Sequence, residues 1–336
     1  MSSSITTTPG VAERESALRV TLRWLLKYAF LVGFVVVFVF FSVQSPAFLS
    51  ASNLLNVLGG SAILLLVAMA LTVVVASGGI DLSVGVALDF GAWIAIAGML
   101  YFGLPWPVAI LAALVCGSLI GVLNAFLIVR LGVTPFLATL GTFFIGRSIQ
   151  QIGTGGGANI SYRDAPEGFR TLAGAETFGV PNELFIVGLI AVLFFVFLSR
   201  SKFGYRIQAM GIQDSAARVA GLATRRYRVG IYIGAAATCA MAGVLLTSGL
   251  RIYTPLAGFT YLLDGIAAVF IGASMHPRIR PNIPGTLVGV LFLSMVNNGL
   301  NLLGLDFNTK AALQGLILLL ALTVAYMVSR RGSSRG

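Results

Sequence analysis

The sequence is poor in charged residues, in histidine, in lysine and in cysteine. Only 10% of its 336 residues are charged, whereas about a quarter are charged in an average soluble domain. So few charged groups do not cover the surface of a water-soluble globule of this length. With 57% hydrophobic residues, the composition favours a chain whose surface mostly faces lipid.

The scarcity of reactive residues excludes several kinds of site. Both cysteines lie inside apolar runs, and His276 is the single histidine, so no disulfide framework and no structural zinc quartet are expected. A P-loop needs a lysine directly after a glycine. None of the three lysines, Lys27, Lys202 and Lys310, follows a glycine. We therefore expect no metal, no cofactor and no enzymatic activity, and in particular no ATP hydrolysis by this chain.

The long apolar runs predict the fold. A transmembrane helix needs about 20 predominantly apolar residues. Ten runs qualify as candidates: 28–43, 54–76, 84–102, 107–129, 133–152, 183–199, 229–250, 259–275, 284–303 and 309–328. The sequence therefore predicts an all-α, polytopic transmembrane bundle of about ten helices over residues 28–328, with tails at 1–27 and 329–336.

The basic residues are distributed unevenly between the connectors. With the N-terminus in the cytoplasm, 17 of the 22 Lys and Arg residues fall in cytoplasmic segments, as the positive-inside rule requires. The net charge of +11 then reflects membrane orientation, and no nucleic-acid binding is expected. We predict that both termini and the basic segment 200–228 are cytoplasmic, and that the glycine-rich loop 153–182 is periplasmic.

Two short segments resemble each other. Residues 117–123 read GSLIGVL, and residues 285–291 read GTLVGVL. They fall in the fourth and ninth apolar runs, so the two copies would cross the membrane in opposite directions. That arrangement is typical of an inverted repeat, here of spans 2–5 and 7–10. The alternative is a chance similarity between two stretches rich in Gly, Leu and Val.

The apolar run from residue 54 to 102 is interrupted at residues 76–85, which read ASGGIDLSVG. Gly78 and Gly79 weaken helix formation, and a charged residue such as Asp81 is costly within a membrane. One interpretation is a helix break beside a transport path, with Ser83 as a further polar group. The other is a short cytoplasmic turn in which Asp81 caps the next helix.

Further polar residues fall within or beside the apolar runs. They are Asp89, Arg147, Asp264, Asn297, Asn298 and Asn301. Ionisable groups at membrane depth usually pair or face water. An ion pair between Arg147 and one of the two aspartates is therefore one prediction, and a position of both acids near an interface is the alternative. The asparagines are candidates either for binding hydroxyl groups of a solute or for joining helices by hydrogen bonds.

Several of these segments carry a resemblance to a known family. The segments are GGIDLSVG at 78–85, FFIGR at 143–147, DSAARVAGL at 214–222, YLLDGIAAV at 261–269 and NNGLNLLG at 297–304. Together they resemble the sugar-type permeases of ABC importers, which include the ribose, xylose, arabinose and galactoside permeases. The resemblance extends from about residue 30 to residue 328. It departs at residues 272–280, GASMHPRIR, where that family usually has a glycine-rich run.

The resemblance implies a subunit of a bacterial inner-membrane importer. Such a permease takes up a monosaccharide or similar small solute by alternating access. Its implied partners are a second permease copy or a sister permease, ABC ATPase subunits and a periplasmic substrate-binding protein. An ion-coupled secondary transporter that uses Asp81, Asp89 or Asp264 is the alternative function.

The resemblance also implies that segment 200–228 contacts the ATPase. The expected contact residues are Asp214, Ala216, Ala217, Arg218 and Gly221, several of which are small enough for a short helix to enter a partner's cleft. The alternative is that this segment is only a positively charged topological anchor.

Overall fold

The structure is a computed structural model that describes residues 30–276, 278–306, 308–310, 312–313, 315–317, 319 and 323. Its helices are Phe30–Gln44, a short 3₁₀ helix Pro46–Leu49, α2 (Ala51–Ala76), α3 (Val84–Phe102), α4 (Trp106–Ala125), α5 (Pro135–Gly153), α6 (Glu167–Arg170), α7 (Asn182–Arg200), α8 (Lys202–Ile212), α9 (Asp214–Val219), α10 (Thr224–Leu250), α11 (Ala257–Ser274) and α12 (Ile283–Leu302). Its strands are β1 (Ile160–Ser161), β2 (Glu176–Thr177), β3 (Val180–Pro181) and β4 (Ile252–Tyr253).

The helices confirm the all-α, polytopic fold. Seven are long and apolar enough to cross a membrane: α2, α3, α4 with its π-helical extension Phe126–Arg130, α7, α10, α11 and α12. Two further predicted spans correspond to the shorter helix Phe30–Gln44 and to α5, which has 19 residues but is less apolar. The tenth predicted span, 309–328, lies largely outside the described residues.

The basic segment 200–228 is more helical than a connector. It contains α8, α9 and the first turn of α10, which begins at Thr224 rather than at residue 229. The apolar run begins only after Arg225, Arg226 and Arg228. Arginine is nevertheless a good helix former. Hydropathy therefore marks where the apolar part of α10 begins, whereas the helix itself extends five residues further toward the N-terminus.

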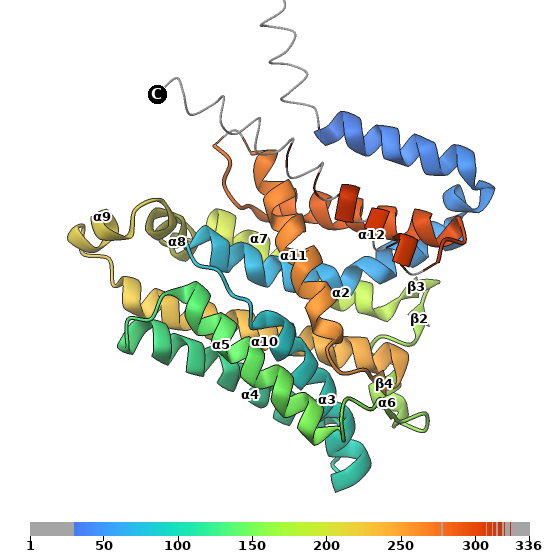
Figure 1. Cartoon of the computed structure of the whole chain (residues 1–336), viewed down its shortest axis with the longest axis horizontal. Helices are drawn as coiled ribbons and strands as arrows, with labels where there is room; N and C mark the ends of the chain where they lie inside the picture. The colour runs from blue at the N-terminus through green and yellow to red at the C-terminus, as the bar shows by residue number, and fades with distance from the viewer. Residues whose placement is uncertain are drawn as a thin grey trace, which may run out of the picture.

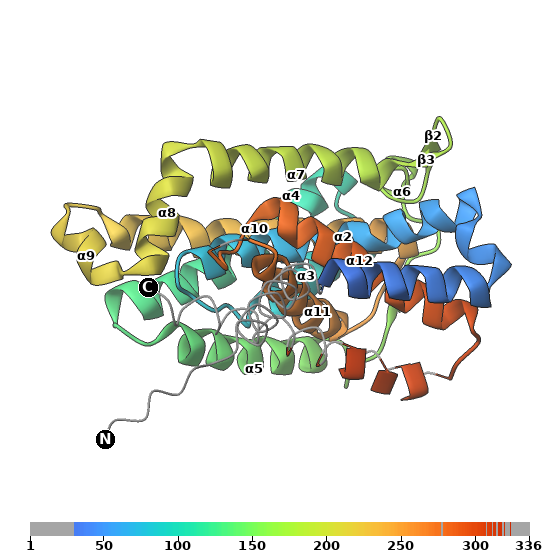
Figure 2. The same ribbon diagram turned by 90° about the horizontal axis from the view of Figure 1, so that it is seen from above.

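The two ends of the bundle carry different structures. In Figure 1, α8 and α9 lie at one end, and α6 and the strands lie at the other. The glycine-rich loop 153–182 is tied down there, because β1 pairs antiparallel with β4 in the connector between α10 and α11. Strands β2 and β3 form a separate small hairpin. Figure 2 shows α7 and α5 on opposite edges of the bundle.

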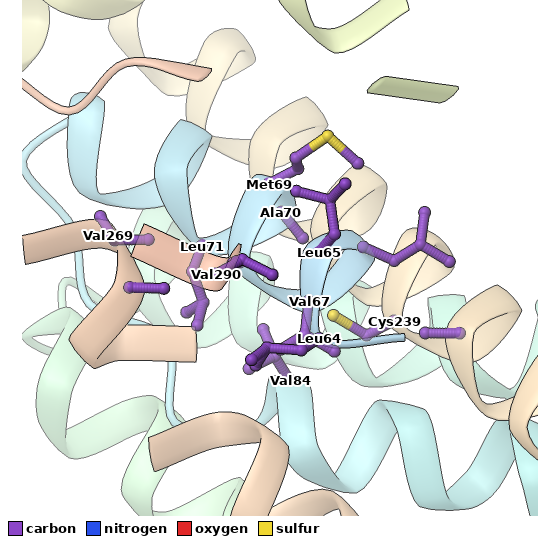
Figure 3. Packing of buried hydrophobic residues seen from close by; sticks show 14 of the residues in the cluster. Leu64, Leu65, Val67, Met69, Ala70, Leu71, Val84, Cys239, Val269 and Val290 are labelled. Atoms are coloured by element: carbon purple, nitrogen blue, oxygen red, sulfur yellow. The ribbon is translucent and has the colours of Figure 1, made fainter. Parts of the chain in front are cut away.

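Helix α2 occupies the centre of the core. Its residues from Leu66 to Ala70 are fully buried, and a helix that is apolar on every side is expected to be enclosed by other helices. Figure 3 shows α2 side chains packed against Val84 of α3, Cys239 of α10 and Val290 of α12. Helices α10, α11 and α12 pack directly against α2.

The helices pack in a repeated order. The contact between α3 and α4 has its counterpart in the contact between α11 and α12. In the same way, the contact between α4 and α10 corresponds to the contact between α12 and α2. The contact of α10 with α3 likewise has its counterpart in the contact of α2 with α11. This order relates α2–α4 to α10–α12, which are three of the four helix pairs in the inverted repeat of spans 2–5 and 7–10 that the sequence suggests; the fourth pair includes residues 309–328, which lie largely outside the described residues.

The two similar glycine segments do not occupy equivalent contacts. Gly117 and Gly121 of α4 pack against α10, whereas Gly285 and Gly289 of α12 pack against α11. Glycine lets helix backbones approach closely in a membrane, and both segments serve that purpose. The packing order, rather than the shared string, therefore supports the repeat.

We predict that Gly243→Ala in α10 destabilises the bundle. A Cβ at Gly243 would lie 1.9 Å from the backbone oxygen of Leu88, and overpacking of this kind costs about 1–3 kcal/mol. A lower midpoint of thermal unfolding in detergent is the expected result. The control is Gly188→Ala in α7, because no atom lies within 4 Å of its added Cβ. Equal midpoints for the two variants would contradict the close packing of α10 on α3.

Candidate functional site

The break between α2 and α3 depends on two glycines. Gly78 has a φ of +81°, a conformation that favours glycine. A Cβ on Gly79 would lie 2.6 Å from the hydroxyl oxygen of Tyr232, so this position also excludes a side chain. Gly211 of α8 contacts the same stretch, since its Cβ would lie 2.1 Å from the backbone oxygen of Ala76. The break is thus packed between α10 and α8.

Asp81 organises the approach to α3. Its Oδ1 accepts hydrogen bonds from the backbone N of Ser83 at 2.8 Å and from Ser83 Oγ at 2.6 Å. Both residues are fully buried. The carboxylate therefore holds a tight turn directly before the first residue of α3, Val84. Asp81 Oδ2 is buried without a hydrogen-bond partner among the described residues.

A chain of polar side chains connects this turn to two other helices. Asn124 of α4 donates from Nδ2 to Ser83 Oγ at 2.6 Å, and Thr142 of α5 donates from Oγ1 to Asn124 Oδ1 at 2.7 Å. These side chains are buried, and buried polar groups are costly unless they are paired. The hydrogen bonds therefore join α3, α4 and α5 at one point.

The first turns of α3 and α11 meet inside the bundle. A Cβ on Gly85 would lie 2.7 Å from the backbone oxygen of Gly258, and a Cβ on Gly258 would lie 2.1 Å from that of Gly85. Asp89, one turn further along α3, accepts a hydrogen bond from the backbone N of Gly258 at 2.8 Å. A carboxylate is favoured at a helix N-terminus by the helix dipole, which explains how a buried acid is accommodated here.

Gln150 of α5 ties the same region to the α10–α11 connector. Its Oε1 accepts from the Tyr253 hydroxyl at 3.1 Å and from the backbone N of Leu256 at 3.3 Å. Burial, and secondarily the charge of Asp89, raises the pKa of Tyr253, so the hydroxyl keeps the proton that it donates. Gln150 Nε2 is buried and makes no hydrogen bond of normal geometry within the described part of the chain, although the Gln150 side chain is close enough to act on the carboxyl group of Asp89.

The remaining charged candidates differ in exposure. Arg147 is exposed and Asp264 is half-buried. The carboxylate of Asp89 bonds to the N-terminus of α11; no ion pair of Asp89 with Arg147 is found among the described residues.

The three asparagines have different surroundings. Asn298 of α12 exchanges two hydrogen bonds with Asn53 of α2, at 3.0 and 2.9 Å, which is the helix-joining arrangement. Asn301 Oδ1 accepts from Lys310 Nζ at 2.7 Å. Asn297 is exposed. Asn298 therefore joins α2 to α12, whereas Asn297 and Asn301 are both exposed.

The segment 272–280, where the resemblance departs, ends α11 and leads to α12. Here partial burial, followed by the positive charges of Arg280 and Arg278, lowers the pKa of His276. The imidazole is therefore held in its neutral form at neutral pH, and its Nδ1 accepts a hydrogen bond from the backbone N of Arg278 at 3.2 Å.

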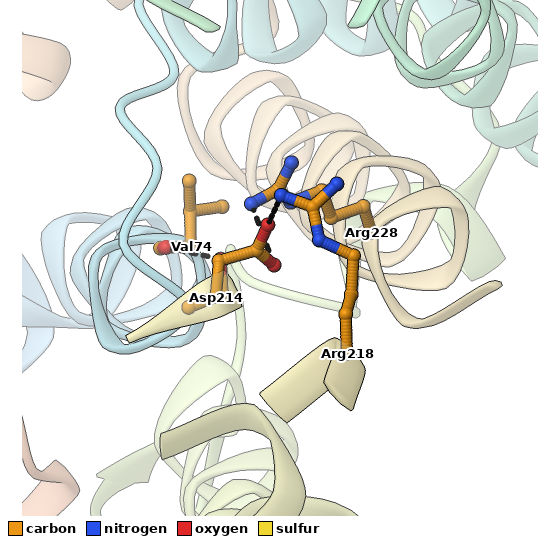
Figure 4. Close-up of polar contacts among 5 residues, drawn as sticks. Val74, Asp214, Arg218 and Arg228 are labelled. Carbon is orange, nitrogen blue, oxygen red and sulfur yellow. Dashed lines mark hydrogen bonds and ion pairs between the residues drawn. The ribbon is translucent and has the colours of Figure 1, made fainter. Parts of the chain in front are cut away.

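The second group of predicted residues lies on and after α9. Asp214 forms ion pairs with Arg218 at 2.7 Å and with Arg228 at 3.0 Å. Figure 4 shows both guanidinium groups at this carboxylate, with Val74 of α2 beside it. The ion pairs attach α9 to the start of α10 close to the end of α2.

The small residues of α9 differ in exposure. Ala217 is buried, whereas Ala216 is exposed. Gly221 ends the turn with a φ of +82°. Val219 is 91% exposed, so the tip of this helix presents an apolar side chain that nothing in the described structure covers.

Asn124, Thr142 and Gln150 were missed by the sequence interpretation. Each is a single uncharged polar residue within a predicted span, and such residues commonly join helices without marking a site. The one signal in the sequence is the composition of α5, which carries several polar side chains within a membrane-length helix.

Comparisons with known proteins place this arrangement among transport proteins. Residues 53–322 match the family described as branched-chain amino acid transport system / permease component. The chain is 35% identical over 290 residues to the ribose import permease protein RbsC of Bacillus subtilis, covering 86% of this chain and 89% of the relative. It is 30% identical over 305 residues to RbsC of Escherichia coli K12, covering 90% and 95%.

A further relative carries a different substrate in its name. The chain is 30% identical over 306 residues to the galactose/methyl galactoside import permease protein MglC of Haemophilus influenzae, covering 84% of this chain and 88% of the relative. No solved structure matches the chain.

We predict that Ser83 and Asn124 are energetically coupled. Ser83→Ala leaves Asn124 Nδ2 without its partner, and an unpaired buried donor costs about 1–3 kcal/mol. The coupling energy is obtained from thermal unfolding in detergent of Ser83→Ala, of Asn124→Ala and of the double variant. We expect the double variant to be much less destabilised than the sum of the single effects. Ser118→Ala is the control, because Ser118 Oγ bonds only to its own helix at Leu114. Strictly additive effects at Ser83 and Asn124 would contradict the network.

Proposed function

The chain belongs to the family of transport permease components that its residues 53–322 match, and from this premise we propose that it is the membrane-spanning subunit of an ABC importer for a monosaccharide or similar small polar solute. Members of this family are non-enzymatic membrane subunits, and ATPase activity resides in a separate subunit. The observation that carries the proposal is the 35% identity to a ribose import permease over nearly the full length of both chains.

The substrate class follows from the named relatives and from the chemistry of the buried cluster. The family description mentions branched-chain amino acids, but the named relatives given above import ribose or galactose and its methyl glycoside. The polar groups around the start of α3 include amides and hydroxyls at Asn124, Thr142 and Gln150. Such groups bind neutral hydroxyls by hydrogen bonds. Asn124 and Thr142 are already paired with each other, and Gln150 Nε2 is the donor of this group that makes no hydrogen bond within the described residues.

The proposed path runs beside α5 and the starts of α3 and α11. Helix α5 has the length of a span but is not apolar enough to count among the seven candidate spans, and it lies at an edge of the bundle (Figure 2). A helix with this composition is better suited to a water-filled path than to lipid. We therefore place the path along α5, where a second permease copy or a sister permease would supply the opposite wall.

Alternating access requires an element that moves between two arrangements. In our proposal this element is the break at residues 77–83, with Gly78, Gly79 and Asp81 shaping the turn. The break contacts Gly211 at the end of α8, and α8 leads directly into α9. Motion at α9 would therefore reach the start of α3 through a close backbone contact.

The proposed partners follow from the same arrangement. The chain has no lysine after a glycine and hence no P-loop, so ATP hydrolysis is assigned to partner subunits. We assign α9 and the residues around it, at Asp214, Ala216, Ala217, Arg218 and Gly221, to the contact with that ATPase. From the Lys and Arg distribution we propose that this end faces the cytoplasm. A periplasmic binding protein would then deliver the solute at the opposite end, near loop 153–182.

An ion-coupled secondary transporter is the competing function, and the buried carboxylates of Asp81 and Asp89 are the observation in its favour. Intramembrane acids often mark ion paths. Both acids, however, use one oxygen to hold a helix start, Asp81 at α3 and Asp89 at α11. This structural use accounts for their burial without a coupled ion.

Uptake by the complete transporter in vesicles tests the proposal. We expect [14C]ribose or [14C]galactose uptake that needs ATP and the binding protein and that persists when sodium and proton gradients are collapsed. Asp81→Asn should insert normally and reduce uptake, because it weakens the acceptor that orders the α2–α3 turn. Uptake that follows an ion gradient without ATP would establish the competing function. Uptake of leucine but of neither sugar would refute the substrate class.

The ATPase contact is tested at the exposed residues of α9. We predict that Ala216→Trp or Val219→Asp leaves insertion intact but abolishes both stimulation of the partner ATPase and uptake. These positions are exposed, so the variants change the surface rather than the fold. Gly221 is unsuitable for this test, because its φ of +82° strains any side chain.

The control for the α9 variants is Phe178→Asp, at a side chain that is 97% exposed in the β2–β3 hairpin. It should leave ATPase stimulation unchanged. Normal co-purification with the ATPase and normal uptake for both α9 variants would show that the contact lies elsewhere and that this segment acts only as a topological anchor.

A further inference from the structure

A groove of about 1090 Å³ lies between α7, α10 and the end of α2. Helices α7 and α10 both have the length and apolarity of membrane spans, and α7 lies on the edge of the bundle in Figure 2. The groove is lined by the last turns of α7, by α8 and by the first turns of α10. It therefore lies at the α8–α9 end of the molecule, where the bundle borders lipid.

The floor of the groove is open along α10. Gly230 and Gly234 are one turn apart, and a Cβ added to either would meet no atom within 4 Å. Two glycines at this spacing usually let another helix pack closely, but no helix in the described part of the chain does so here. Phe194 and Ile231 contribute apolar side chains to the walls, so the interior is suited to hydrocarbon.

The mouth of the groove is cationic. Arg206 of α8 and Arg226 of α10 both line it, and Arg206 Nη1 donates to the Tyr227 hydroxyl at 2.7 Å. The Tyr227 ring contacts Phe203, with 6.1 Å between ring centroids. The Arg206 side chain is thus held at the mouth by an aromatic pair rather than extended freely into solvent.

These two arginines have no nearby acid within their own segment. Asp214 is the single carboxylate in residues 200–228, and it is already shared by Arg218 and Arg228. Arg226 lies in the first turn of α10, and Gly234 follows about 12 Å further along the helix at 1.5 Å per residue. The groove is therefore cationic at one end and apolar along its length.

From this polarity we propose that the groove binds an anionic phospholipid, with its phosphate at Arg206 and Arg226 and its acyl chains along Phe194, Ile231 and Gly234. Basic pockets between transmembrane helices are suited to anionic lipid headgroups. A protein helix would need polar backbone ends or matching side chains along the groove, whereas a phospholipid has one anionic end followed by hydrocarbon. The proposal depends on membrane insertion and not on the transported solute.

Lipid binding is measured on the purified full chain by native mass spectrometry, with phosphatidylglycerol and phosphatidylcholine as separate probes. We expect tighter binding of phosphatidylglycerol. The double variant Arg206→Gln/Arg226→Gln should weaken it about twenty-five-fold, at about fivefold for each basic residue near an anionic headgroup. Gly234→Phe should weaken both lipids by filling the groove, and the open space at Gly234 lets the fold accept the larger side chain.

The matched control is Lys202→Gln/Arg225→Gln, which removes the same charge from the same segment at residues that do not line the groove. Equal losses in the two double variants would show a diffuse charge effect and overturn the proposal. Equal binding of both lipids to the wild type would also overturn it. If Gly234→Phe changes the oligomeric state but not lipid binding, the groove is a contact between copies and not a lipid site.

Discussion

The first turns of α3 and α11 lie so close that neither has room for a side chain at the contact. Gly85 and Gly258 each occupy the space in which the other would place a Cβ. This approach brings Asp89 within hydrogen-bonding distance of the α11 N-terminus. The α10–α11 connector, Gln150 and the glycine-rich loop paired to β4 are arranged around that junction. A larger residue at either glycine would push the first turns of α3 and α11 apart at this contact.

The break before α3 is tolerated because its polar groups find partners within the protein. Backbone groups away from water must be hydrogen-bonded, and here the N of Gly79 donates to the carbonyl of Val74 at 3.1 Å, while Asp81 accepts from Ser83. Residues 77–83 interrupt the helix, as both interpretations of the sequence expect. Asp81 is not the cap of α3, because the N-cap is Ser83; Asp81 instead holds the turn before it by accepting from the backbone N of Ser83.

The sequence predicted the fold better than the site. Long apolar runs locate α2, α3, α7 and α12 to within a few residues, because a membrane-spanning helix is recognised by the length and apolar composition of its sequence. The basic start of α10 was missed, since hydropathy does not record helix propensity. Gly78, Gly79 and Asp81 stood out as exceptions in an apolar run. Asn124 and Gln150 did not, because their importance comes from which distant residues they reach, and one sequence without its fold does not contain that geometry.

The placement of α8 explains why a change at the α9 surface need not stay local. Gly211 lies against the backbone of Ala76 with no side chain between them, so α8 cannot shift far without moving the end of α2. Asp214 holds α9 to Arg228 of α10, which gives the same segment a second attachment. A contact made of backbone atoms is stiff, because no side chain is available to change rotamer and absorb the displacement. In the proposed transporter, a pull on α9 therefore acts on the α2–α3 break and on the start of α10 together.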